Sequence, residues 1–231
     1  MDKNTKKTIF RMAYGFGSRG KYSSCISKEE YQELMKYARE RNIKLEGFKK
    51  YAGDIHLIKE MLDDIVIVAK DFPKILEGRK SLVVRLDENL LESDFATTNR
   101  HLISINARIF NNREYLEKEY QLLADIGMFV EGTNYRSIIR HELGHVVAYT
   151  YRIDTIRIAK QILNQDNIDK IYEYIMNNLS LYAAEYEHGV EFISESFSAY
   201  YSNIDNFFAK EYLNMCKDYA KEGNDYDKRY V

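Results

Sequence analysis

The sequence predicts an α+β fold that is mostly helical and contains a small sheet. Apolar residues recur at three- and four-residue steps over most of the 231-residue chain. Two short segments between residues 81 and 106 instead have the β-branched or alternating character of strands. With 45% hydrophobic residues the chain can bury one substantial core. We therefore expect a helical region over residues 1–80 that packs on a second region over residues 81–231, in one compact unit.

Helical patterns dominate the N-terminal region. Residues 14–25 are rich in Gly, Ser and Tyr and predict an irregular arm before the first helix. Ser27 followed by Glu30 is a capping-box pattern, which predicts a helix that ends near Asn42. A second helix is predicted over residues 54–71, because the apolar residues there share one helical face and a proline follows.

Two strands and a further series of helices are predicted in the second region. Residues 81–86 and 101–106 read as strands, and together they predict the small sheet. The helical pattern returns over residues 113–125. It then runs from Thr133 through a histidine-containing segment and continues, with short turns, to about residue 222.

Composition excludes several classes of protein. The chain has 34 basic and 36 acidic residues, so we expect no nucleic-acid partner, because phosphate binding needs a basic excess. No apolar run approaches the 18 residues of a membrane span, and the N-terminus lacks the apolar segment of a secretory signal. We therefore expect a cytoplasmic protein without a membrane partner. Two cysteines form neither a disulfide framework nor a thiolate metal site.

The segment His141-Glu142-Leu143-Gly144-His145 is an HExxH motif inside an apolar helical pattern. Residues four positions apart lie one turn apart on the same helical face, so two imidazoles at this spacing can share one Zn²⁺ ion. Glu142 then lies beside the metal, where its carboxylate can take a proton from zinc-bound water. Gly144 permits close packing beneath the site. The alternative is a helix whose histidines only contact nearby carboxylates.

A catalytic zinc site needs a third protein ligand. The metzincin extension is absent, since Tyr151 stands where that motif has histidine, and His56 and His101 are isolated. Glu191 and Glu195 instead place two carboxylates one turn apart on an apolar helix. We expect Glu191 to bind zinc and Glu195 to orient a ligating histidine, His141 in the first instance. The reverse assignment of the two glutamates and a solvated acidic face stay open.

The order HELGH, then Tyr182-Ala183, then Glu191-Phe-Ile-Ser-Glu195-Ser-Phe197 resembles the catalytic domain of anthrax lethal factor-like zinc metallopeptidases. That family includes bacterial Pro-Pro endopeptidases and is similar to domains encoded by phages and prophages. The resemblance spans about residues 80–203. It implies a zincin-like fold of the gluzincin type with the sheet above the active-site helix, a peptide or protein substrate and a phage-associated context. It also implies that Glu191 is the zinc ligand and that Tyr182 lies at the zinc-bound water or the oxyanion.

The chain departs from that family at two positions near Glu191. The family tyrosine stands seven residues before the ligand glutamate, where this chain has Ala184, so Tyr186 is an alternative to Tyr182. His188 stands where the family has asparagine, three residues before the glutamate. Two alternatives are open for His188, a hydrogen bond in the site and a position on the surface.

The predicted strand over residues 101–106 has a functional interpretation. An extended substrate can pair antiparallel with a strand at the edge of a sheet over the active-site helix. We therefore expect His101 and Ser104 to contact substrate, with an ordinary internal strand as the equal alternative.

These observations predict an endopeptidase that binds one zinc ion per chain and uses Glu142 as general base. A catalytically silent zincin-like scaffold that binds a protein partner is the first alternative. A helical phage protein with a purely architectural zinc ion is the second. The intact Glu142 favours the enzyme, because only catalysis requires that carboxylate.

Overall fold

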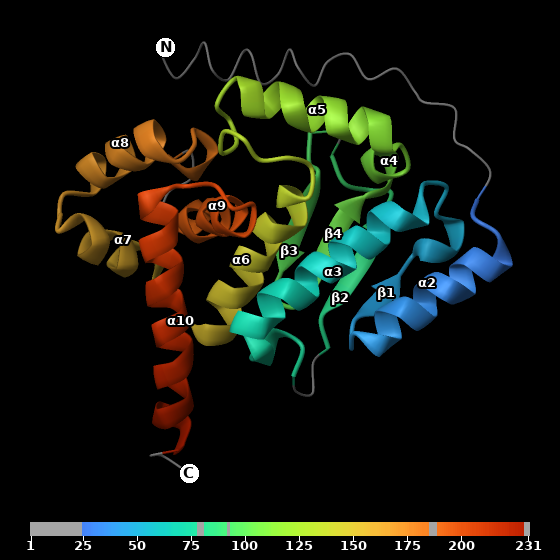
Figure 1. The fold of residues 1–231 in the computed structure, drawn as a ribbon, viewed down its shortest axis with the longest axis horizontal. Coiled ribbons are helices and arrows are strands. Elements are labelled where there is room, and N and C mark those ends of the chain that lie inside the picture. Colours follow the sequence, from blue (N-terminus) through green and yellow to red (C-terminus); the bar gives the residue numbers. More distant parts are fainter. Residues whose placement is uncertain (1–24, 78–80, 92, 185–188, 229–231) are drawn as a thin grey trace.

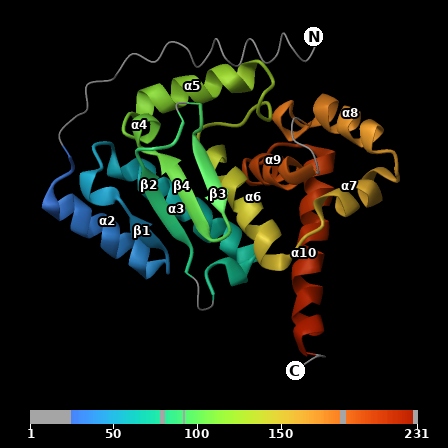
Figure 2. The ribbon, with the colours of Figure 1, turned by 180° about the vertical axis from the view of Figure 1, so that it is seen from behind.

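The computed structural model describes residues 25–77, 81–91, 93–184 and 189–228. It shows an α+β fold, mostly helical, with one four-stranded sheet, and this part of the fold prediction is confirmed. Helices α3 and α6 lie in front of the strands in Figure 1 and behind them in Figure 2, so both cover the same face of the sheet. Residues 14–24 of the predicted irregular arm are not among the described residues.

The first two predicted helices are confirmed, with their local capping groups. Helix α2 (Lys28–Glu40) begins after Ser27, whose hydroxyl accepts a hydrogen bond from the Glu30 backbone N–H at 3.1 Å. The Glu30 carboxylate accepts one from the Ser27 N–H at 2.7 Å, which completes the capping box. Helix α3 (Ile55–Asp71) begins after the N-cap Asp54 and ends just before the 3₁₀ turn η3 (Pro73–Ile75).

The sheet has the strand order β1-β2-β4-β3. Strands β2 (Val83–Asp87) and β4 (Leu102–Asn106) correspond to the two predicted strands, while β1 (Lys44–Glu46) and β3 (Ala96–Asn99) were not predicted. Strand β2 pairs in parallel with both β1 and β4, and β3 pairs antiparallel with β4. Buried residues of β2 and β4 such as Val84, Ile103 and Ile105 carry the apolar face.

Of the two alternatives left open for residues 101–106, the ordinary internal strand is confirmed and the edge strand is wrong. Strand β4 lies between β2 and β3 and is hydrogen-bonded on both sides, because the chain turns back after β3 and inserts β4 next to β2. The outer strand is β3, and it packs beside α6.

The N-terminal region is not only helical, because it also contributes β1 to the sheet. The pairing of β1 with β2 and the packing of α3 against α6 both cross the expected boundary near residue 80. A short 3₁₀ turn, η2 (Phe48–Lys50), follows β1, and its Phe48 is buried in a hydrophobic core that the two regions share.

The rest of the described chain is helical. Helix α5 covers the predicted residues 113–125, while α6 begins at Ser137 and not at Thr133. No helix in the described ranges is long and apolar enough to cross a membrane. The helices after the sheet are α4 (Ala107–Phe110), α5 (Arg113–Asp125), α6 (Ser137–Tyr151), α7 (Thr155–Leu163), α8 (Ile168–Asn178), η4 (Tyr182–Ala184), α9 (Val190–Tyr201) and α10 (Phe207–Lys228).

A buried ion cluster joins α3 to the start of α6. The side chain of Asp64 is only 1% exposed and accepts two hydrogen bonds from Arg136, each of 2.8 Å, and one of 2.9 Å from Arg140. Because a buried carboxylate is stable only when it is paired, this cluster fixes the two helices in one relative position.

Candidate metal centre

Helix α6 presents the two histidines of the HExxH motif to one side. His141 and His145 lie one turn apart, and their ring centroids are 5.1 Å from each other. His141 is buried and His145 is half-buried. The four-residue spacing therefore brings the two imidazoles together on one face of the helix, as predicted.

Helix α9 supplies the carboxylate that faces these rings. Glu191 lies in its first turn, just after Gly189, which adopts a left-handed backbone conformation with φ of 59°. Its Oε2 atom is 3.1 Å from His141 Nε2 and 3.3 Å from His145 Nε2. All three potential ligand atoms lie within 4.8 Å of one another. Residues about fifty positions apart in the sequence thus meet at one point.

A close approach of α6 and α9 makes this meeting possible. A Cβ atom at Gly144 would lie 2.6 Å from Ser194 Cα and 3.0 Å from Ser194 N, closer than real side chains come. Only glycine at this position lets the two helices pack at the observed distance. Gly144 therefore sets the separation between the histidines and Glu191.

The donor types and two of their separations are those that a zinc ion would need. Zinc–nitrogen and zinc–oxygen bonds of about 2.0–2.1 Å in a tetrahedron place neighbouring ligand atoms about 3.3 Å apart. The observed separations of 3.1 and 3.3 Å match that edge length. Glu191 Oε2 is fully buried yet has no partner in hydrogen-bonding geometry among the described residues. An orphaned buried carboxylate oxygen that faces two imidazole nitrogens is a donor set that a cation would satisfy.

The charges of the centre depend on one another. Burial lowers the pKa of His141, but the carboxylates of Glu191 and Glu195 outweigh it and raise that pKa well above its usual value. Burial raises the pKa of Glu191, whereas the imidazoles of His141 and His145 lower it more strongly, to about 2. In the metal-free protein Glu191 is therefore ionised at neutral pH, whereas His141 must lose its proton before it can bind a metal ion.

Glu195 contacts the other nitrogen of His141. Its Oε1 lies 2.8 Å from His141 Nδ1, and the Glu195 side chain is almost fully buried one turn after Glu191. A hydrogen bond from Nδ1–H to this carboxylate fixes the ring orientation and leaves Nε2 directed at Glu191. The structure thus brings Glu191 and Glu195 to opposite nitrogens of the same imidazole.

Glu142 lies beside this cluster and is held by a residue that sequence reasoning missed. The Thr98 hydroxyl, on the outer strand β3, is 2.6 Å from Glu142 Oε2 and 3.3 Å from the Glu142 backbone carbonyl oxygen. The only sequence signal for Thr98 is the Ala-Thr-Thr-Asn stretch, which is β-branched but too polar to read as a strand.

Tyr182 lies close to His141. The structure places it in η4, with its ring centroid 5.5 Å from that of His141 and 6.0 Å from that of Phe129. Together with His141, Glu142 and Phe95 it lines a cavity of about 340 Å³. The alternative tyrosine, Tyr186, and His188 lie outside the described residues.

The residues expected to contact substrate, His101 and Ser104, are not brought to the cluster. Ser104 is buried in β4, which has no free edge. His101 precedes that strand and packs edge-on against Tyr149, at a centroid distance of 5.4 Å. These two residues were chosen because their strand was expected at the edge of the sheet, and that position belongs to β3.

Comparison of the chain with models of protein families, with curated proteins and with solved structures finds no match, so the chemistry of this centre is argued from its own residues.

Proposed function

We propose that this protein is a zinc-dependent endopeptidase. The observation that carries the proposal is the convergence of His141, His145 and Glu191 beside the carboxylate of Glu142. A zinc ion held by these three residues would keep a position for water, as in a catalytic site and unlike a closed structural one. We further propose one zinc ion per chain and a zincin-like fold of the gluzincin type, in line with the resemblance to lethal factor-like peptidases.

The reaction assigns a separate task to each residue. When bound, the zinc ion supplies Lewis-acid chemistry, which acidifies water and polarises a carbonyl group. Glu142 acts as general base towards the attacking water and then passes the proton to the departing amine. Thr98 holds the Glu142 carboxylate by its hydrogen bond of 2.6 Å, and Glu195 holds His141. Tyr182, near His141, is the candidate donor to the oxyanion, a contribution of about 3 kcal/mol in other enzymes.

The outer strand β3 gives the substrate a place to bind. One long edge of β3 pairs with β4, and Thr98 on this strand contacts Glu142 directly. A peptide that adds to the outer edge of β3 would run past the general base in an extended conformation, with main-chain hydrogen bonds fixing its register. Peptides and unfolded protein segments are therefore the substrates that we propose.

The test compares the wild-type protein with Glu142→Gln on an unbiased peptide library, each with and without a chelator. The proposal expects cleavage by the zinc-loaded wild type, loss of cleavage on chelation, and full zinc content without cleavage in Glu142→Gln. If the zinc-loaded wild type cuts no peptide, the enzyme proposal fails and a silent scaffold that binds a partner takes its place. If Glu142→Gln cuts as fast as the wild type, the assignment of the general base is wrong.

A further inference from the structure

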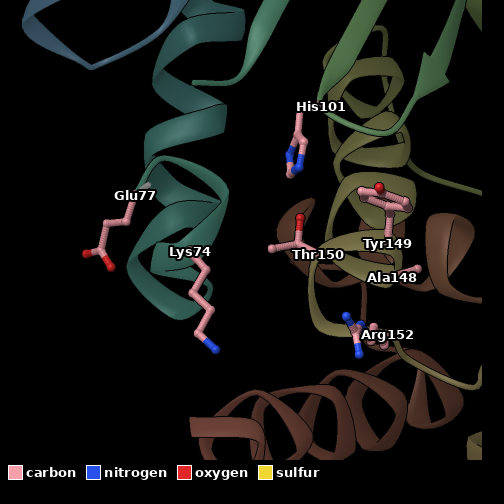
Figure 3. A pocket seen from close by; sticks show the side chains of 7 residues that line it. All are labelled: Lys74, Glu77, His101, Ala148, Tyr149, Thr150 and Arg152. Atoms are coloured by element: carbon pink, nitrogen blue, oxygen red, sulfur yellow. The ribbon is translucent and has the colours of Figure 1, made fainter. Parts of the chain in front are cut away.

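A second hollow lies at the C-terminal end of α6, apart from the metal centre. It has a volume of about 690 Å³. Figure 3 shows its lining side chains, which come from η3 and the residues after it, from the turn between β3 and β4, and from the last turn of α6. Its lining includes Lys74, Glu77, His101, Tyr149, Thr150 and Arg152.

Among the described residues of the lining, cations outnumber carboxylates. Lys74 and Arg152 contribute two cations, and in Figure 3 the single carboxylate, that of Glu77, points away from the space between them. Arg152 forms no ion pair with any residue that the structure describes. The guanidinium group of Arg100 lies 5.7 Å from the ring centroid of Tyr149 at the rim. The partial negative charge of about one half at the end of α6 is too small to cancel these cations.

The hollow also offers a hydroxyl group and an aromatic wall. Thr150 Oγ1 is buried and has no hydrogen-bond partner among the described residues. In Figure 3 this hydroxyl points towards the side of the hollow where His101 lies. Tyr149 is 46% exposed, so its ring forms an aromatic wall of the hollow. Cations, a free hydroxyl and an aromatic surface together fit a carboxylate on a short aliphatic stem.

The hollow lies in line with the metal centre. His141, His145 and Tyr149 are spaced by four residues and share one face of α6. Strand β3 runs alongside this face, since Thr98 contacts Glu142 and Arg100, just after the strand, contacts Tyr149. At 1.5 Å per helical residue, Tyr149 to Arg152 lie about 9–14 Å beyond the midpoint of the two histidines. An extended peptide covers that distance in about three or four residues.

We infer that this hollow is a substrate subsite for an aspartate or glutamate side chain, three or four residues from the bond that is cut. The inference rests on the proposed endopeptidase function and deepens it by naming a substrate class. The acidic side chain would enter between Lys74 and Arg152 and accept a hydrogen bond from Thr150, while its main chain continues along β3.

The experiment sequences the products that the zinc-loaded wild type releases from a peptide library of random composition. We expect acidic residues to be enriched about fivefold at one position three or four residues from the cut, the size of one well-placed exposed ion pair. In the double variant Lys74→Glu, Arg152→Glu the preference should reverse to lysine and arginine at that same position. Arg157→Glu, an exposed arginine on α7, is the matched control and should keep the wild-type profile.

Two further measurements keep the outcomes distinct. Arg152→Gln removes one charge without reversing it and should halve the enrichment or more, even if the double variant does not fold. Zinc content and thermal unfolding verify that each variant is intact. If the wild type cuts peptides but shows no acidic preference at these positions, or the preference survives in Arg152→Gln and in the folded double variant, the subsite is refuted while the peptidase stands. If the wild type cuts nothing, both fall.

Discussion

Gly144→Ala tests whether the packing of α6 on α9 positions the proposed metal ligands. The new methyl group would lie 2.6 Å from Ser194 Cα, whereas ordinary contact begins at 3.4 Å, so the helices must separate by about 0.8 Å at this point. Glu191 and Glu195 lie on α9, within one turn of Ser194, and would move away from the histidines. Misplacement of this size costs roughly 100-fold in rate.

The effect on stability should be small by comparison. Overpacking costs about 1–3 kcal/mol, and alanine regains about 1 kcal/mol of helix propensity over glycine. We therefore expect a net loss of about 0–2 kcal/mol in the free energy of unfolding of the metal-free protein. Zinc affinity, by contrast, should fall at least tenfold.

The assay is a zinc competition titration on wild type and Gly144→Ala, with urea unfolding of the metal-free proteins beside it. Ser194→Gly in the Gly144→Ala background is an informative second variant. The clash is with the backbone of Ser194, so removing its side chain should not restore zinc affinity. Wild-type zinc affinity in Gly144→Ala would refute the claim that this contact sets the ligand geometry.

Three other predictions follow from the described contacts. Thr98→Val should lower kcat about tenfold or more, with little change in KM or zinc content, because the proposed general base loses its hydroxyl donor. Thr98→Ser should restore kcat, and a wild-type kcat in Thr98→Val would remove Thr98 from the mechanism. Asp64→Asn should lower the free energy of unfolding by about 3–5 kcal/mol in urea, because Arg136 and Arg140 lose a buried counter-charge. Asp63→Asn, at a partly exposed ion pair, should cost under about 1 kcal/mol, and equal losses in the two variants would contradict the role of the buried cluster. Burial raises the pKa of the Cys216 thiol, so iodoacetamide at pH 8 should label only Cys25 in the folded protein. Rapid labelling of both cysteines would show that α10 opens.

Local sequence signals predicted the helices well, since their causes lie within a few residues. The capping box of Ser27 and Glu30 and the N-cap Asp54 fix the starts of α2 and α3 without help from distant parts of the chain. The four-residue spacing of His141 and His145 likewise follows from helix geometry alone.

The sheet was harder to predict, because strand order depends on contacts far apart in the sequence. Strand β1 has the sequence Lys-Leu-Glu and β3 has Ala-Thr-Thr-Asn, which are too short and polar to show an alternating pattern. The insertion of β4 between β2 and β3 moved the free edge to β3, and with it the contact of Thr98 to Glu142. No local pattern could have shown this.

The candidate metal site lies between these two cases. The chemistry of the donors pointed to Glu191 and Glu195, but the fifty-residue gap left their order open. The structure relates them to different nitrogens of His141, through the close packing of Gly144 on Ser194. The spacing of the two glutamates by one helical turn is what allows both to reach one imidazole.

The most direct test of the central claim is the zinc stoichiometry of the purified, metal-depleted and reconstituted protein, measured for wild type, His145→Ala and Glu142→Gln. The account predicts one zinc ion per chain in the wild type and in Glu142→Gln, and a loss of at least tenfold in affinity in His145→Ala. A wild-type protein that takes up no zinc, or a His145→Ala variant that binds it as tightly as the wild type, would contradict the account.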